Sequence, residues 1–370
     1  MAIQKQRESN IELFRIITML LIVAHHYVVN SGLIDIISEN PSSPRSLFYL
    51  IFGAWGKTGI NCFVLISGYY MCKSQISLRK SLKLILQIVF YSVFLYILFV
   101  MIGKYQFSKM NFLKQFLPIK SVGNGFVSCY LVFFFLIPFL NKALQGMDRI
   151  MHLILIWFLI LIFTILPVVP YMYYSIYFSY VSWFVVLFFI GAYLRLYPDN
   201  LLCKQIGLRL VILLLLSTLS IVFFANRLPR ADQDIYYAHY LLADSNKPLA
   251  LLTAVYAFLY FKQLKIGYHK WINLLAASTF GVLLIHTSNR TWLWDDMLKN
   301  SSMYSSSLWV LHAILSVIAV FLVCSVIDML RIRFLERPFF RWYDQNEARM
   351  LHTGRNYMEK TRNYVNRRSN

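Results

Sequence analysis

The chain has few charged residues and especially few acidic ones. Only 14% of its 370 residues are charged, 59% are hydrophobic, and the mean hydropathy is +0.57. Soluble globular domains carry about 25% charged residues. A soluble globule is therefore excluded, and we expect an integral membrane protein.

Cysteine is scarce and unpatterned. The five cysteines are odd in number and form no CxxC or Cys/His spacing; they are Cys62, Cys72, Cys129, Cys203 and Cys324. This pattern implies neither a disulfide framework nor a metal site. The first ten residues are polar, and no small-residue cleavage site follows the first apolar run. We therefore expect that run to stay as a membrane anchor.

What the chain does have is a series of long apolar runs. A spanning helix needs about 20 apolar residues, and ten segments qualify: 11–30, 47–72, 81–103, 126–144, 151–171, 177–196, 208–225, 246–263, 273–290 and 308–331. The predicted fold is an all-α bundle of ten transmembrane helices. We expect residues 1–345 to form one transmembrane domain and residues 346–370 a basic cytoplasmic tail.

Positive charge dominates, with 36 Lys and Arg against 16 Asp and Glu and a formal net charge of +20. The cations gather in alternate loops and in the tail, which places both termini in the cytoplasm by the positive-inside rule. The tail is expected to lie against anionic lipid, and nothing suggests a nucleic-acid-binding fold. The loop 104–125 disagrees, because it has four lysines and no acid on the outer side. Either it binds an anionic group there or one span is miscounted.

The first apolar segment contains ionisable residues, which are candidates for function because burying a charged side chain in a membrane costs free energy. Arg15 and His26 are eleven residues apart, so on a helix they share one face and lie about 16 Å apart along it. Glu12 precedes Arg15 by three residues and is close enough to pair with it. His25 is rotated by about 100° from that face.

Two interpretations of this pattern stay open. In the first, Glu12 and Arg15 are interfacial side chains, and the histidines are polar packing groups. In the second, Arg15 holds a phosphorylated carrier near the cytoplasmic face, and His26 is a general base toward a hydroxyl. The separation resembles the length of an extended pantetheine arm.

Four motifs follow one another across nearly the whole chain: Glu12, Arg15 and His26; the glycine-spaced segment 56–69, which ends in Ser67-Gly68-Tyr69; Ser278 to His286; and Glu336-Arg337-Pro338-Phe339. In this order they resemble the motifs of the membrane-bound acyltransferase 3 family. Taken alone, the glycine and serine spacing of the second motif would indicate close helix packing. Glu12 stands where the family more often has Asp.

The resemblance implies an O-acyltransferase of a bacterial plasma (inner) membrane. Such an enzyme moves an acetyl group from acetyl-CoA to a hydroxyl of a cell-surface polysaccharide or its lipid-linked precursor, without a metal. The resemblance also assigns His26 as base or transient acyl acceptor and Glu12 as the group that fixes Arg15. Lys80 and Lys83 join Arg15 in binding the CoA phosphates. Further contacts with substrate are expected from His286 and Ser67.

Two departures from the family pattern bear on binding. The family usually has two arginines three apart after the second span, whereas this chain has Arg79, Lys80 and Lys83. Lysine keeps the charge but loses the bidentate fork. Where relatives often have Trp-Tyr before an apolar span, this chain has Gly125-Phe126, so an aromatic that lines the pocket is absent.

Rival interpretations remain. A multi-span transporter of a glycan or lipid fits the hydrophobicity equally well, with Arg15 and His26 lining a conduit. A membrane glycosyltransferase ranks third, because such enzymes need large loops with acidic residues. His286 has harmless roles as a packed histidine, and Lys57 either snorkels or touches an anionic carrier. The acceptor, the side of transfer, the choice between covalent and direct routes, and the oligomeric state are not readable from the sequence.

Overall fold

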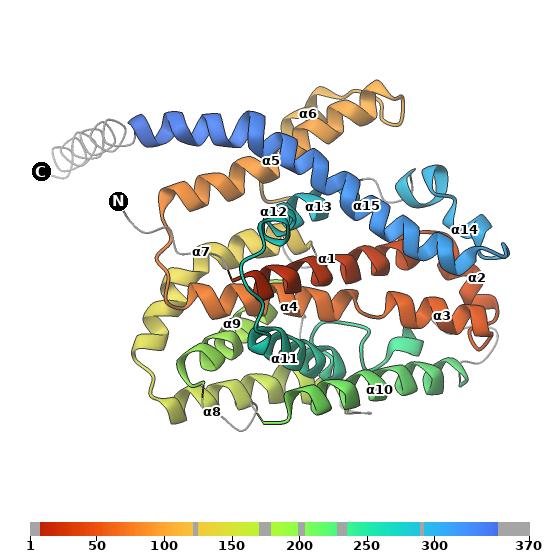
Figure 1. Ribbon diagram of the computed structural model, residues 1–370, viewed down its shortest axis with the longest axis horizontal. Helices are drawn as coiled ribbons and strands as arrows, with labels where there is room; N and C mark the ends of the chain where they lie inside the picture. Colours follow the sequence, from red (N-terminus) through yellow and green to blue (C-terminus); the bar gives the residue numbers. More distant parts are fainter. Residues whose placement is uncertain are drawn as a thin grey trace, which may run out of the picture. The chain divides into compact units, whose positions relative to one another are not determined.

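The computed structural model describes residues 8–120, 125–169, 179–198, 204–227, 235–288 and 292–346. Within these ranges every regular element is a helix, which confirms the all-α prediction (Figure 1). The α-helices are α1 (Ser9–Val29), α2 (Leu33–Glu39), α3 (Pro44–Gly53), α4 (Gly56–Met71), α5 (Leu78–Met101), α6 (Lys109–Lys114), α7 (Phe126–Gln145), α8 (Arg149–Ile160), α9 (Tyr180–Leu196), α10 (Ile206–Ala225), α11 (Pro248–Gln263), α12 (Lys270–Ala277), α13 (Thr279–His286), α14 (Asn300–Met303) and α15 (Trp309–Arg331).

Seven helices in the described ranges are long and apolar enough to cross a membrane. They are Ser9–Val29, Pro44–Met71, Leu78–Met101, Phe126–Gln145, Arg149–Val168, Ile206–Ala225 and Trp309–Asn346. Each coincides with one of the ten predicted segments. The other three segments hold shorter helices, namely α9, α11 and the pair α12–α13. The multi-pass architecture is thus confirmed, while the count of ten and the cytoplasmic termini stay predictions.

The chain divides into two compact units, Met1–Ser325 and Val326–Asn370. In the second unit, Arg331 bonds Asp328 (Nε to Oδ1, 2.8 Å) and pairs with Glu336 (3.0 Å), across a π-helical turn at Ile332–Glu336. Glu336 opens the fourth family-like motif. The predicted tail lies almost wholly outside the described residues, so its boundary stays a prediction.

Helix α4 is the central element of the first unit and packs against α1, α9 and α11 (Figure 1). Two glycines allow its close approach to α9. A Cβ atom at Gly191 would lie 2.8 Å from the carbonyl oxygen of Leu65 and 2.9 Å from the amide nitrogen of Tyr69. At Gly68 it would lie 2.9 Å from the Cα of Phe188. The glycine spacing therefore serves backbone-to-backbone packing, as small residues do between membrane helices.

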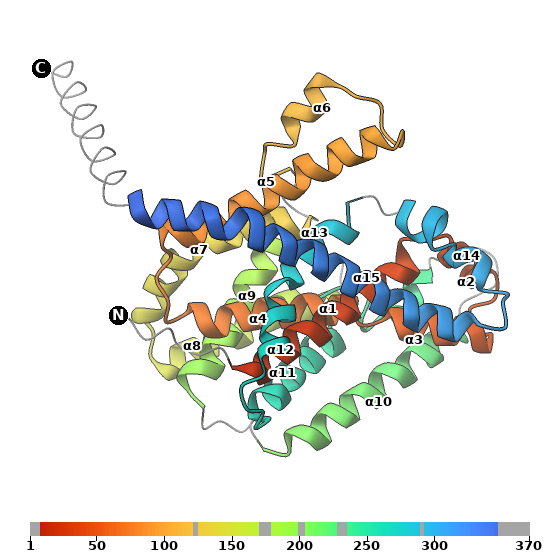
Figure 2. The same ribbon diagram turned by 45° about the horizontal axis from the view of Figure 1, so that its top comes forward.

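Helices α1 and α4 lie side by side and run antiparallel (Figures 1 and 2). Gly56 faces His25 so closely that a Cβ atom there would overlap the imidazole. One turn along α4, Gly59 faces Ile22, which is one turn back along α1. This contact brings the start of α4 to the level of the histidines near the end of α1.

Candidate functional site

A cavity of about 610 Å³ opens at this level of the first unit. Its walls come from α1, α4, α7, α9 and α13 and from the loops that join them. The described residues that line it are Ile22, His25, His26, Val29, Asn30, Gly56, Lys57, Ile60, Lys120, Gly125, Phe126, Val127, Ser128, Tyr180, Ala243, Leu283 and Thr287. Gly125 and Phe126 both belong to the wall, so the expectation that no aromatic lines the pocket at this place is wrong. Eight of the lining residues have polar side chains, so the cavity offers several hydrogen-bonding groups to a ligand.

The imidazoles of His26 and His286 meet beside this cavity. His26 Nδ1 lies 2.9 Å from His286 Nε2, and His286 Nδ1 lies 2.6 Å from the carbonyl oxygen of Val282. A carbonyl oxygen only accepts, so His286 carries its proton on Nδ1, and its Nε2 is then an acceptor in the neutral ring. His26 must therefore donate from Nδ1, which leaves the lone pair of a neutral His26 on Nε2. The relay therefore sets the tautomer of His26.

His26 lies in the last turn of α1, where the backbone carbonyls carry partial negative charge. His25 lies beside it, and its Nδ1 is 2.7 Å from the carbonyl oxygen of Gly53. This bond ties His25 to the end of α3.

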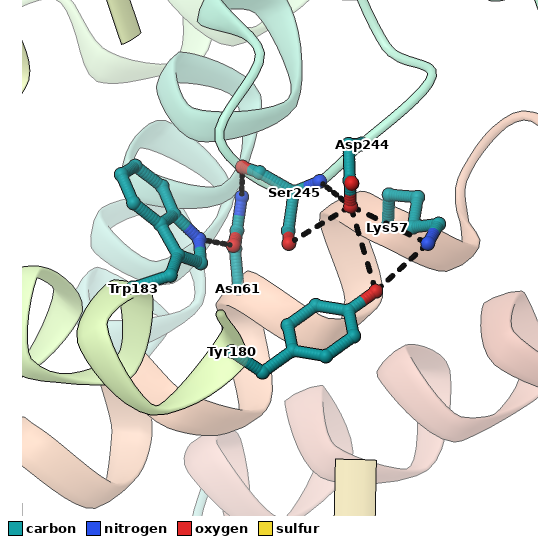
Figure 3. A network of polar contacts seen from close by, with 6 residues as sticks. All are labelled: Lys57, Asn61, Tyr180, Trp183, Asp244 and Ser245. Atoms are coloured by element: carbon teal, nitrogen blue, oxygen red, sulfur yellow. Dashed lines mark hydrogen bonds and ion pairs between the residues drawn. The ribbon is translucent and has the colours of Figure 1, made fainter. Parts of the chain in front are cut away.

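A chain of polar contacts forms another part of the wall (Figure 3). Lys57 Nζ lies 2.7 Å from Tyr180 OH and 3.4 Å from Asp244 Oδ1. Ser245 donates its amide N–H to the same Asp244 oxygen at 2.8 Å. The Ser245 carbonyl accepts from Asn61 Nδ2 (2.7 Å), and Trp183 Nε1 donates to Asn61 Oδ1 (2.8 Å).

The inner residues of this network of polar contacts, Asn61, Trp183 and Ser245, are fully buried. A network whose polar groups are satisfied is rigid. Lys57, at the cavity end, is therefore held in place by groups that extend into the core. Its pairing with Asp244 makes the charge tolerable inside a membrane protein.

Arg15 lies at the opposite end of α1, about 16 Å from His26 along the helix axis. It is half-buried, and its Nε is buried without a hydrogen-bond partner among the described residues. Arg15 is near enough to Tyr70 to interact with it electrostatically. Arg195 Nη1 donates to the hydroxyl of the adjacent Tyr69 at 3.1 Å, and Lys262 lies 5.8 Å from the same ring. We call Arg15, Arg195 and Lys262 the basic cluster.

Glu8 pairs with the basic cluster. Its carboxylate accepts from Lys262 Nζ at 2.7 Å and from Tyr70 OH at 2.8 Å. Burial alone would raise the pKa of Glu8, but the hydrogen bonds from Lys262 and Tyr70 outweigh it and hold the pKa below its ordinary value. Glu8 thus offsets the charge of one cation of the cluster, Lys262.

The other predicted site residues lie elsewhere. Glu12 is buried one turn before Arg15, and their pairing stays a prediction. Ser67 bonds the Phe63 carbonyl (3.1 Å) and the Tyr130 hydroxyl (2.9 Å). Lys80 bonds its own loop, at Ser74 Oγ and the Gln75 carbonyl, and both Lys80 and Lys83 are exposed. None of Ser67, Lys80 and Lys83 is among the described residues that line the cavity.

The lysine-rich loop is described over residues 104–120, where it holds the short α6 and no helix long enough to span a membrane. Lys104 pairs with Asp296 at 2.8 Å. Lys120 lines the cavity, and its ammonium bonds Ser92 Oγ and Gln115 Oε1. One lysine of the loop therefore belongs to the site.

Sequence reasoning missed several residues of the site, among them Asn30 and Asp244, and left the role of Lys57 open. Asn30 lies four residues after His26, so the helical period could have placed it on the same face. Asp244 carries no pattern, because it belongs to a short loop that meets Lys57 only in the folded chain. The sequence shows Lys57 as a cation beside a glycine, but it does not predict which acid pairs with this lysine.

One of the comparisons with known proteins identifies a family. A protein-family model described as an acyltransferase domain of the acyltransferase 3 type matches residues 8–329. The match includes every element that lines the cavity and the basic cluster. No curated protein and no solved structure shows significant similarity to the chain.

Proposed function

The chain belongs to the acyltransferase 3 family, and from this premise we propose that it moves an acetyl group from acetyl-CoA to a hydroxyl of a cell-surface polysaccharide or its lipid-linked precursor. The membrane helices and the family support a multi-pass membrane acyltransferase. The finer assignment rests on one observation. His26 and His286 form an oriented imidazole pair beside a cavity, which is the arrangement that a general base requires.

In this proposal His26 Nε2 takes the proton of the acceptor hydroxyl as the oxygen attacks the thioester carbonyl. A carbon–oxygen bond forms, and the carbonyl becomes an oxyanion. Collapse of this intermediate breaks the carbon–sulfur bond, and the leaving thiolate of CoA receives the proton from His26. His286 keeps the His26 ring in the productive tautomer throughout, in the way that a third group orients the base of a catalytic triad.

The basic cluster is the proposed anchor for the CoA phosphates. Arg15 has an unsatisfied buried Nε, and Arg195 and Lys262 add charge beside it. The distance of about 16 Å from Arg15 to His26 suits a pantetheine arm laid along α1. Lys80 and Lys83 act here as exposed charges that attract the phosphates without direct contact in the cavity.

The proposed membrane is the bacterial plasma (inner) membrane, with the basic cluster on the cytoplasmic side where acetyl-CoA is available. Ser67 stabilises the helix packing around Tyr130 in this scheme and does not touch the acceptor. His286 acts through His26. Both residues thereby take roles that differ from the direct substrate contacts expected from the resemblance.

The test is transfer of acetyl from radiolabelled acetyl-CoA by the purified protein in lipid nanodiscs, with envelope from a deletion strain as the acceptor source. We expect ester-linked label with the wild type and none with His26→Ala. His269→Ala is the matched control, because His269 is an exposed histidine away from the cavity. If wild type and His26→Ala transfer nothing while glycan or lipid moves across the membrane, a transporter is the better assignment.

A further inference from the structure

The proposed reaction places negative charge on the thioester carbonyl oxygen, and His26, as the base, does not stabilise that charge. The last turn of α1 destabilises it, because the helix carbonyls repel an oxyanion. Enzymes meet this need with fixed hydrogen-bond donors aimed at the developing oxyanion. Two side chains on the cavity wall have N–H groups available for this role.

Asn30 is one such donor. It follows His26 by four residues, so the two side chains lie within about 40° of each other around α1 and about 6 Å apart along it. Asn30 lines the cavity, and its Nδ2 is buried without a hydrogen-bond partner among the described residues. Buried polar groups in native proteins are nearly always paired. An unpaired amide beside the base points to a ligand that supplies the missing acceptor.

Lys57 is the second donor. An ammonium has three N–H groups, and the described residues give Lys57 two partners, Tyr180 and Asp244. One N–H therefore remains for a group in the cavity. The network behind Lys57, shown in Figure 3, fixes its position through Asp244 and Ser245. Fixed donors are effective because they need no reorganisation when charge develops.

The two donors lie at the level of the base. Because α4 runs antiparallel to α1 and Gly56 abuts His25, Lys57 enters the cavity from α4 near the height of His26. Asn30 enters it one turn further along α1. A thioester carbonyl placed next to His26 Nε2 is therefore approached from two helices.

We infer that Asn30 Nδ2 and Lys57 Nζ form the oxyanion site for the acyl donor. This rests on the proposed function. When the acceptor oxygen bonds to the carbonyl carbon, the electron pair of the C=O double bond moves onto oxygen, and the two N–H groups donate to it. The pair returns as the carbon–sulfur bond breaks, and the proton passes from His26 to the thiolate. Asn30 and Lys57 gain and lose no atom in the cycle.

The experiment compares kcat with ground-state binding in the nanodisc assay. Asn30→Leu and Lys57→Met should each lower kcat by about 10²–10³, the effect of removing one oxyanion donor. The Kd of S-ethyl-CoA, a thioether with no carbonyl, should stay within about three-fold of the wild type, because the donors act only on the carbonyl. Asn226→Leu is the matched control for Asn30, since Asn226 also caps a helix C-terminus but is exposed. Lys104→Met is the control for Lys57, since Lys104 also pairs with an aspartate.

Asn30→Asp provides a second variant of nearly the same shape, with an acceptor in place of the donor, and should be at least as impaired as Asn30→Leu. Wild-type transfer with kcat unchanged in all three variants would overturn the oxyanion site and leave the proposed function intact. Loss of S-ethyl-CoA binding in parallel with kcat would show that both residues are structural, which also overturns it. Absence of any transfer by the wild type would instead refute the proposed function.

Discussion

His26 Nδ1 lies 2.9 Å from His286 Nε2, although 260 residues separate the two histidines. The contact joins the end of α1 to the end of α13, and the Val282 carbonyl fixes its direction. A histidine that the sequence alone could assign to helix packing thereby orients the imidazole of His26.

This relationship predicts how substitutions at His286 rank. Glutamine places an amide oxygen near the former Nε2 and can accept from His26, whereas leucine cannot. We expect His286→Gln to keep most of the activity and His286→Leu to lower kcat by about 10²–10⁴, the range seen when a base loses its orienting group. Acetyl transfer in nanodiscs measures both, with S-ethyl-CoA binding as the check on folding. Equal activity of the two variants would mean that the tautomer is not controlled by position 286.

The basic cluster predicts that a substitution of Arg15 raises the KM for acetyl-CoA much more than a substitution of either lysine of α5. Arg15→Gln should raise the KM for acetyl-CoA by about 10- to 100-fold, because a hydrogen bond between charged groups contributes roughly 1.5–3 kcal/mol. Lys80→Gln and Lys83→Gln should change KM by about three-fold or less, since exposed charges are screened by water and salt.

Acetyl-pantetheine, which lacks the nucleotide phosphates, separates charge recognition from folding in this comparison. Arg15→Gln should use it as well as the wild type does. If Arg15→Gln loses acetyl-pantetheine turnover in proportion to acetyl-CoA turnover, Arg15 supports the helix bundle and does not bind phosphate.

The sequence predicted the features that depend on local pattern. Apolar length located the long helices, and Arg15 and His26 lie on the single helix α1, as their spacing within one apolar segment predicted. Those predictions hold because helical geometry is the same in every fold. The glycine spacing around Gly68 likewise indicated close packing, and the contact with Phe188 confirms it.

Contacts between distant segments could not be predicted from the sequence. Asp244 contacts Lys57 because the loop before α11 folds over α4, and no residue pattern predicts that contact. Ser67 was expected at the substrate, yet its hydroxyl bonds Tyr130 on α7, since the motif places it further along α4 than the cavity. The sequence could indicate which residue types have functional chemistry, but the packing of the helices determines which of these residues contact one another.

Glu8 predicts a pH dependence of stability outside the membrane. Its pKa is lower in the folded chain than its ordinary value of 4.5, so the pair with Lys262 stabilises the fold above that value. The contribution is lost as the pH falls through the lowered pKa. Glu8→Gln should therefore reduce Tm at pH 7.5, by an amount equivalent to about 1 kcal/mol or less for a partly exposed pair. Thermal unfolding in detergent should show the two proteins converging at acidic pH, and a difference that persists or grows there would contradict the assignment.

The backbone contact between α4 and α9 predicts that Gly191→Ala destabilises the bundle. The added methyl group would meet the Leu65 carbonyl and the Tyr69 amide, and backbone atoms cannot move aside without shifting a helix. Overpacking of this kind costs about 1–3 kcal/mol, whereas alanine in a helix is otherwise favoured over glycine by about 0.5–1 kcal/mol. Gly207→Ala, where the nearest atom is a Tyr260 ring carbon at 4.0 Å, is the matched control and should be neutral or slightly stabilising. Thermal unfolding of both variants decides the point, because a Gly191→Ala protein as stable as Gly207→Ala would show that α9 does not depend on this close approach.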